Sequence, residues 1–254
     1  MPFDPFYVMM LSMKNTEIKH TTEIKDTAEI KDTAEIKRTA EVRHTTEIRH
    51  FSFQDKTTFQ RLRGHLSTVL THKFFVAQGC FRLGLYRQGI LHDLSKFSPT
   101  EFIPGVRYYD GHMSPNNVER HLHDGCSLAW VHHKGRNKHH FEYWTDLSMN
   151  PEEGIVGCRM PMRYVAEMFC DRRAACIAYH GKEYRQSDAW AYYVRSRFRL
   201  AIHPDTRAVL EKALVLMRDE GEAAAFAWLR QALSVTKGQD YTAATFGLDH
   251  TPLP

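Results

Sequence analysis

The sequence has little cysteine and no long apolar run. Its five cysteines form no C-x-x-C pair and are odd in number, so neither a zinc ribbon nor a disulfide framework is predicted. No stretch reaches the roughly 18 apolar residues of a membrane-spanning helix. The first residues are apolar but lack a basic leader and a small-residue cleavage site, which is untypical of a signal peptide. We therefore expect a cytoplasmic protein without a membrane partner.

The sequence also lacks a large excess of charge of either sign. Lysine and arginine total 34 against 30 aspartates and glutamates, which gives a formal net charge of +4 beside 16 histidines. No dense Lys/Arg stripe is present, so no nucleic-acid partner is expected. This balance supports at most a weakly basic pocket for a small anionic or phosphorylated substrate. The length of 254 residues suits one well-packed domain with appendages.

A six-residue repeat of the form Thr/Ala-Glu-Ile-Lys-x-Thr occupies residues 16–50. On an α-helix, steps of six residues turn by about 240°, so the repeated Ile and Val side chains scatter over three directions. A β-solenoid of two coils would bury little and would lack caps. We expect residues 1–51 to form a mobile or marginally helical extension without a role in chemistry.

The remaining sequence predicts an all-α domain over residues 52–236 and a loosely attached tail over 237–254. Apolar periodicity favours helices, and no convincing alternating strand pattern is present. The candidate helices span 53–85, 86–96, 116–134, 137–147, 161–179, 187–200, 206–218 and 222–235, and a further helix starts at Ser98. Ser98, Pro99 and Glu101 predict a helix start with a capping box. Turn residues predict a loop over 107–117 and a turn over 149–157.

An adjacent His92-Asp93 pair follows the apolar helical segment that ends at Leu91. Imidazole and carboxylate are the donors that first-row divalent metals prefer. Upstream, Leu66, Val69, Leu70 and Val76 recur at helical spacing, and we expect His72 to lie on the same inward face, with His65 as the competing candidate. Downstream, Asp171 shares a helix face with apolar residues, and a buried carboxylate requires a metal or cation beside it.

Four histidines are clustered among aromatic residues between these two regions. They are His132, His133, His139 and His140, near Trp130, Phe141, Tyr143 and Trp144. These neighbours favour burial. On one uninterrupted helix His133 and His140 would lie roughly 10 Å apart, too far to share a metal. Either Gly135 bends the segment or the histidines serve different centres, whereas His112 in the preceding loop is expected to be exposed.

The ordered set His72, His92-Asp93 and Asp171 resembles the H…HD…D signature of the HD-domain superfamily of helical metal-dependent phosphohydrolases. The wider pattern resembles an uncharacterised bacterial family of HD-like proteins. The resemblance implies an HD-like helical bundle that hydrolyses a phosphate ester with a metal-activated water, and nucleotide-like esters are among the candidate substrates. His139, His140 and Glu142 are similar to a run in the cyclic-dinucleotide phosphodiesterases, but the glycine-rich continuation of that motif is missing.

The resemblance also implies residue roles. Asp93 would bind metal and orient the nucleophile, and His72, His92 and Asp171 would complete the primary site. His133, His139 and His140 would hold a second metal or contact phosphate. The remaining catalytic candidates are Lys96, Arg136 and Asn137, of which Lys96 or Arg136 would stabilise the anionic transition state.

The sequence leaves several alternatives open. One or two divalent ions are expected, and Mn, Fe, Co, Ni, Zn and Mg are not distinguishable from the ligands. A di-iron oxygenase or other oxidative enzyme on the same scaffold would use similar residues. A non-catalytic metal-binding scaffold, with the repeat as an interaction arm, is the third reading. The oligomeric state is not predicted.

Overall fold

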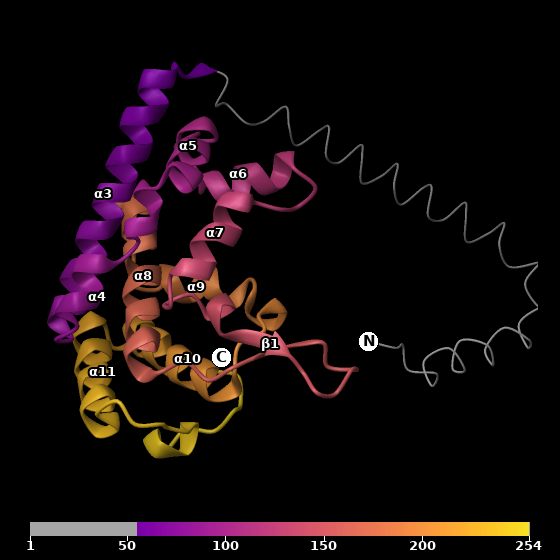
Figure 1. Cartoon of the computed structure of the whole chain (residues 1–254). Coiled ribbons are helices and arrows are strands. Elements are labelled where there is room, and N and C mark those ends of the chain that lie inside the picture. Colours follow the sequence, from indigo (N-terminus) through magenta and orange to yellow (C-terminus); the bar gives the residue numbers. More distant parts are fainter. Residues whose placement is uncertain (1–54, 254) are drawn as a thin grey trace, which may run out of the picture. The chain divides into compact units, whose positions relative to one another are not determined.

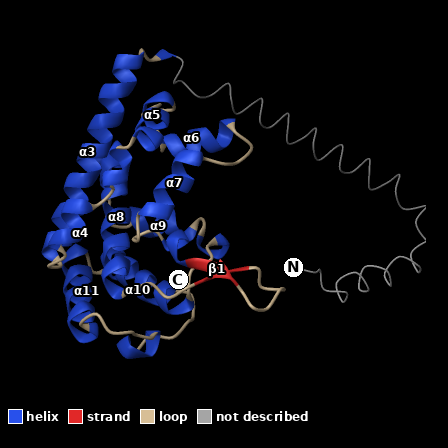
Figure 2. Ribbon diagram, in the orientation of Figure 1, coloured by secondary structure: helices blue, strands red, loops and turns tan. Residues whose placement is uncertain are grey.

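The computed structural model describes residues 55–253, and this part of the chain is mainly α-helical (Figure 1, Figure 2). The all-α class is therefore confirmed, with one small two-stranded hairpin added to it. The predicted repeat extension over residues 1–51 lies outside the described residues. Within residues 55–253, no helix is long and apolar enough to cross a membrane.

Helix α3 (Thr58–Arg82) begins at a capping box and packs against α8 (Met162–His180). The Thr57 side chain accepts from the Gln60 backbone N–H, and the Gln60 side chain accepts from that of Thr57, which satisfies two N–H groups of the first turn. The two helices approach closely at Gly79, where a Cβ would stand 2.9 Å from Cys170 Sγ. The face of α3 turned inward buries His65, Val69, His72, Val76 and Cys80. Leu66 and Leu70, which the spacing placed on this inward face, are exposed, so that part of the prediction is wrong.

The helix predicted over 86–96 is interrupted at its centre. Helix α4 (Tyr86–Leu91) ends before His92, and a 3-10 turn, η2 (Leu94–Phe97), begins after Asp93. Asp93 adopts a left-handed conformation with φ 53°, which Asp tolerates better than most residues. Lys73 Nζ on α3 donates to the carbonyls of Ile90 and His92 at 2.7 Å each. The junction is thereby tied to α3, with His92 and Asp93 buried.

Three short helices follow, α5 (Pro99–Arg107), α6 (Pro115–Leu122) and α7 (Leu128–Arg136). The predicted helix over 116–134 is thus divided, because Asp124 and Gly125 both have positive φ. Ser127 caps α7 by accepting from the Trp130 N–H at 3.0 Å. Helix α5 contacts both α3 and α7, so it supports the two elements that carry His72 and His133.

Helix α8 is also packed against α9 (Asp188–Val194), α10 (Pro204–Asp219) and α11 (Glu222–Thr236). Short 3-10 turns, η4 (Gly181–Glu183) and η5 (Arg197–Arg199), lie between α8 and α10. Large buried side chains of this part are Phe169, Leu210, Leu214, Met217, Phe226 and Leu229. Gly221, with φ 91°, precedes α11, which agrees with the predicted helical hairpin.

The helix predicted over 137–147 and the turn predicted over 149–157 are wrong in part. A 3-10 turn, η3 (Phe141–Trp144), leads into strand β1 (Thr145–Leu147), which pairs antiparallel with β2 (Ile155–Gly157). Three residue pairs are too few to give a readable alternating pattern. Gly157 lies close to the backbone before α10. A Cβ at this position would stand 2.4 Å from His203 N, so only glycine fits there.

The tail is packed rather than loosely attached. Tyr241 is 2% exposed, and the 3-10 turn η6 (Ala243–Phe246) contacts α10. Asp205 Oδ1 accepts from the Ala243 N–H at 2.8 Å and lies 2.9 Å from His250 Nε2. The expectation of a loose tail failed because these contacts join residues about 40 positions apart, which local composition does not indicate.

Candidate metal centre

Four segments bring their polar side chains to one buried place. Helix α3 contributes His72, the α4–η2 junction contributes His92 and Asp93, and α8 contributes Asp171. The end of α7 and the loop after it contribute His133, His139 and His140. The seven residues predicted as metal ligands fall into two groups of four donors, with Asp93 in both, and the donor atoms of each group lie within 4.8 Å of one another.

The first group joins α3, the junction and α8. His72 Nε2 lies 3.0 Å from Asp171 Oδ1 and 3.5 Å from Asp93 Oδ2. His92 Nε2 lies 3.2 Å from the same Asp93 oxygen and 3.4 Å from Asp171 Oδ1. The Nε2 atoms of the two histidines are 3.4 Å apart. Two imidazole nitrogens and two carboxylate oxygens therefore converge on one small volume.

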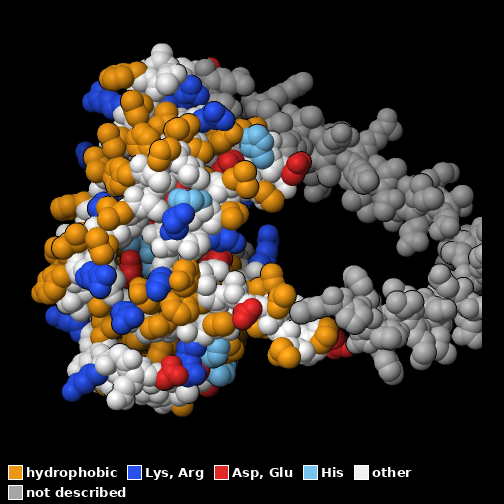
Figure 3. Space-filling view, in the orientation of Figure 1, with side chains coloured by type: hydrophobic (Ala, Val, Ile, Leu, Met, Phe, Trp, Pro, Cys, Tyr) orange, Lys and Arg blue, Asp and Glu red, His pale blue; other side chains and the backbone are white. Residues whose placement is uncertain are grey.

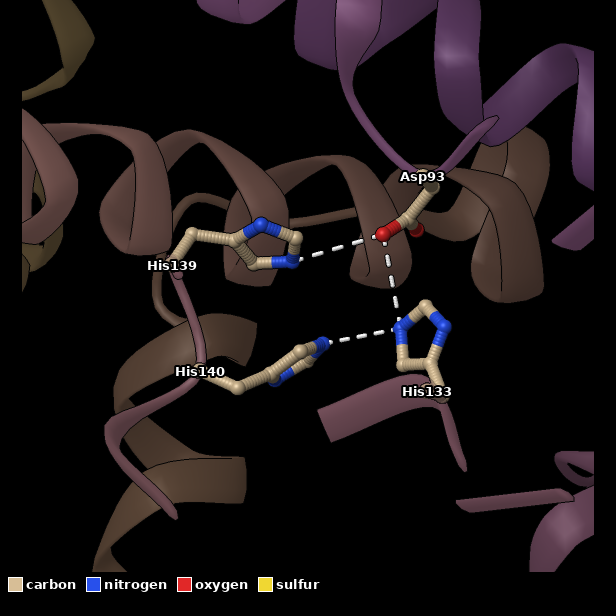
Figure 4. A group of neighbouring side chains, drawn as sticks. All are labelled: Asp93, His133, His139 and His140. Atoms are coloured by element: carbon tan, nitrogen blue, oxygen red, sulfur yellow. Dashed lines mark hydrogen bonds and ion pairs between the residues drawn. The ribbon is translucent and has the colours of Figure 1, made fainter. Parts of the chain in front are cut away.

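The second group lies around the other oxygen of Asp93, as Figure 4 shows. His133 Nε2 is 3.3 Å from Asp93 Oδ1, and His139 Nε2 is 3.5 Å from it. His140 Nε2 lies 2.9 Å from His133 Nε2. Two imidazoles thus point at one carboxylate oxygen and the third, His140, contacts His133, so the two Asp93 oxygens face different histidine groups.

The end of α7 explains how His133 and His140 meet. The helix stops at Arg136, and the Asn137 side chain donates to the His133 carbonyl at 2.8 Å. The chain then turns back, so His140 approaches His133 instead of continuing along the helix axis. Gly135 lies inside α7, so the bend predicted there is not what joins the two histidines.

The donor atoms fit a bound metal better than they fit one another. Within residues 55–253, both Asp93 oxygens and His139 Nε2 are buried without a hydrogen-bond partner of normal geometry. Leaving such groups unsatisfied costs free energy, and a metal ion between them satisfies all of them. Distances near 3 Å between donors are expected when they surround one ion, because metal–ligand bonds are about 2.0 to 2.2 Å. The residues present therefore suit a bound metal ion.

Two glutamates orient the histidines, and neither was predicted from the sequence. Glu167 Oε1 lies 2.9 Å from His92 Nδ1 and 3.3 Å from His139 Nδ1. It accepts from both rings and leaves both Nε2 atoms facing the clusters. Glu101 Oε2 lies 2.7 Å from His133 Nδ1. Carboxylates that hold the second ring nitrogen fix the tautomer of a metal-binding histidine and raise its basicity.

The sequence contains signals for both glutamates, but their spacing was interpreted differently. Glu167 precedes Asp171 by four residues and so lies on the same face of α8. Glu101 was assigned to a capping box with Ser98, and that assignment is wrong. Ser98 makes no side-chain cap, and the Glu101 carboxylate contacts His132 and His133 at 2.7 Å each.

Electrostatics keep the carboxylates of the centre ionised. Burial opposes ionisation of Asp93, but His92, Lys96 and His133 outweigh it and hold its pKa well below the usual range. Burial likewise opposes ionisation of Asp171, and hydrogen bonds from His72 and His92 hold its pKa well below the usual range. Two full negative charges thus face the donor clusters, which favours cation binding.

Of the other predicted site residues, Lys96 and Asn137 contact the donor residues, and Arg136 does not. Lys96 Nζ lies 2.7 Å from Asp93 Oδ2 and is partly exposed, and Asn137 Nδ2 lies 3.2 Å from His133 Nδ1. Arg136 is exposed and donates to His132 at 2.6 Å, so it lies outside the donor clusters. His65 packs on Phe102 with its pKa lowered by burial to about 4, and His112 is exposed.

The centre lies in the part of the chain that matches a known family. A family model described as "Family of unknown function (DUF5662)" matches residues 61–216. No curated protein and no solved structure matches the chain. The matched range includes every donor of both clusters and the two glutamates behind them. Because it covers more than half of the chain, the protein belongs to the family of unknown function DUF5662.

Proposed function

We propose that this protein is a metal-dependent hydrolase of phosphate esters, with two divalent ions in an HD-like helical bundle. One observation carries the proposal, namely that Asp93 presents one oxygen to each of two histidine clusters. Ions bound there would lower the pKa of a bound water to make a nucleophile and would screen charge on the phosphoryl oxygens. The H…HD…D resemblance supports the same chemistry.

The charge of the centre supports an anionic substrate. Two divalent ions would bring four positive charges against the four negative charges of Asp93, Asp171, Glu101 and Glu167. Lys96 adds another positive charge beside Asp93, and its side chain is 26% exposed. The pKa of Lys96 is raised because Asp93 and Asp171 outweigh the opposing effect of burial. A phosphate group approaching from the solvent therefore meets a net positive site.

In this proposal the side chains of the protein hold the metal ions and orient the histidines and the substrate. Asp93 fixes the spacing of the two clusters through one rigid carboxylate. Glu167 and Glu101 hold the imidazoles so that Nε2 faces inward. Lys96 contacts the substrate anion and stabilises the charge that develops on it. Arg136 is left out of the proposal because it binds His132 on the exposed side of α7.

The donor set also favours one rival function. Five of the seven donor residues are histidines, and imidazole suits Fe, Zn, Cu and Ni better than Mg. A di-iron oxidative enzyme on the same scaffold would therefore use the same residues. Two bound irons with an oxygen-dependent absorbance change would favour this rival over the hydrolase.

The experiment combines metal analysis with an activity screen. Purified protein is expected to hold two divalent ions per chain and to hydrolyse p-nitrophenyl phosphate or its bis ester. Asp93→Ala should lose both ions and activity. Asp171→Ala should lose activity and the ion between His72 and His92, while His112→Ala, at an exposed histidine, should keep both ions. Retention of two ions by Asp93→Ala would contradict the site, and full occupancy without hydrolysis would contradict the reaction.

A further inference from the structure

An apolar stripe runs along the outer side of α3. Its residues are Phe59, Leu62, Leu66, Leu70, Phe74 and Phe81, which are the large hydrophobic side chains of α3 that stand exposed. Phe59 is 71% exposed, Phe74 63% and Leu70 50%. Figure 3 shows hydrophobic side chains along the edge of the molecule that Figure 1 labels α3 and α4. We call these six residues the α3 stripe.

The α3 stripe is centred on a different side of the helix from the buried face, which it borders at Leu62. At 100° per residue its members fall within an arc of about 120°. The buried face, with Val69, His72 and Val76, is centred about 110° away around the helix axis. Leu62, Leu66, Leu70 and Phe74 form an unbroken i, i+4 ridge, which is the feature that helices most often pack together.

The stripe continues onto α4. The rings of Phe81 and Tyr86 are 5.4 Å apart, and Ile90 and Leu91 are also exposed. Nine apolar side chains at about half exposure present roughly 900 Å², since a large side chain offers about 150–250 Å². A standard interface buries about 800 Å² per partner, and single exposed patches of this size are unusual on monomers.

The stripe is self-complementary about Leu70. If two α3 helices cross antiparallel with a twofold axis at Leu70, position i faces position 140 − i. Phe59 then faces Phe81, and Leu66 faces Phe74. The segment from Lys56 to His92 contains no Asp or Glu, so its charged residues are all basic. In this register each basic residue of one helix faces an uncharged residue of the other, as Arg63 faces Ala77. Like charges are therefore not opposed.

We propose that a second copy of this chain covers the α3 stripe and forms a twofold dimer through antiparallel α3 helices. The isologous contact closes on itself, as most homodimers do. The repeat over residues 16–50 is a poor occupant because its aliphatic residues scatter around a helix. His72 points away from the stripe on the same helix, so dimer formation does not require the metal centre.

The first test measures the mass of the full chain by sedimentation equilibrium across micromolar concentrations. The wild-type protein should have twice the mass of one chain. Leu70→Glu places two glutamates face to face on the axis and should raise the dimer dissociation constant at least about a hundredfold, as for a central interface residue. Val235→Glu, at an exposed residue of α11, is the matched control and should stay dimeric. Circular dichroism should be unchanged in both variants.

The second test reads the register by cross-linking. Cys126 and Cys158 are exposed and would be changed to Ser, whereas the other three cysteines are buried. In that background Leu70→Cys alone should cross-link to itself with a short bis-maleimide. Phe59→Cys should cross-link only when mixed with Phe81→Cys. A monomeric wild-type chain, or a dimer unaffected by Leu70→Glu, overturns the proposal. A monomer that binds anionic vesicles through Leu70 assigns the stripe to lipid and overturns it as well.

Discussion

Asp93 combines a strained backbone with a buried carboxylate whose two oxygens face different histidine groups. Its φ of 53° lies in the left-handed region, where a residue with a Cβ pays about 1–2 kcal/mol relative to glycine. Such strain persists where the surrounding structure enforces it, and it is concentrated at functional sites. The conformation turns one carboxylate toward both histidine groups, which an ordinary helical residue at this position would not do.

This strain gives a prediction on stability. Without metal, Asp93→Gly should be more stable than Asp93→Ala by about 1 kcal/mol, because both remove the carboxylate but only glycine accepts φ 53° without strain. Urea unfolding of chelator-treated variants measures the difference. Equal stabilities would mean that the junction relaxes to a negative φ when the carboxylate is absent.

Glu167 and Glu101 give a matched pair for a second prediction. Glu167 contacts one histidine of each group, whereas Glu101 contacts His133 of the second group and His132, which is not a donor. Glu167→Gln should weaken the binding of both ions by about 10- to 100-fold, the range found when a carboxylate behind a metal ligand is lost. Glu101→Gln should weaken one ion only. Calorimetric titration with Zn²⁺ or Mn²⁺ separates the two steps, and equal patterns in the two variants would contradict this assignment.

At the scale of elements, the sequence predicted those helices that have a clear apolar periodicity and a proline or glycine at their ends. Helices α8, α10 and α11 begin and end within about two residues of the predicted bounds, because apolar spacing, Pro161, Pro204 and Gly221 mark them. The break at Asp93 was missed because neither glycine nor proline marks it. It arises from the contacts of Lys73 and from the convergence of side chains on Asp93, and both are tertiary.

The candidate site was predicted better than the elements that carry it. His72, His92, Asp93 and Asp171 were found from helix faces and from one motif, and the His cluster from its aromatic neighbours. The register of His133, His139 and His140 could not be predicted, because it depends on where α7 stops. Glu101 was misread since a local capping box and a distant histidine contact require the same residue type.

The docked tail gives a prediction on pH. Burial raises the pKa of Asp205, but the Ala243 N–H and His250 outweigh it, so the pKa is lowered. A lowered carboxyl pKa contributes stability above the unfolded value of about 4, and the contribution is lost as pH falls through the folded value. Below about pH 4, the protection factor of the Ala243 amide, the unprotected exchange rate divided by the observed rate at the same pH, should therefore fall. In Asp205→Asn the protection factor should be low at neutral pH and should no longer fall below about pH 4. An Asn variant with wild-type protection would contradict the role of the carboxylate.

At the scale of the whole molecule, the repeat and the helical domain are expected to be independent. The family match begins at residue 61, and the capping box of α3 begins at Thr57, so both lie after the repeat. Deletion of residues 1–50 should leave the thermal midpoint within about 2 °C and the bound metal unchanged. Loss of cooperative unfolding or of metal in the shortened chain would show that the repeat stabilises the domain.

The donors of the first group lie at positions 72, 92, 93 and 171, so an ion bound there acts as a cross-link between chain segments about 100 residues apart. Cross-links of long loops restrict the unfolded chain most strongly. Two such ions sharing Asp93 would close several loops at one point, and the chain could not open α3 away from α8 without releasing an ion. The lifetime of the folded state would then depend on the rate of metal release, and a chelator would shorten that lifetime at a temperature where the metal-bound chain stays folded.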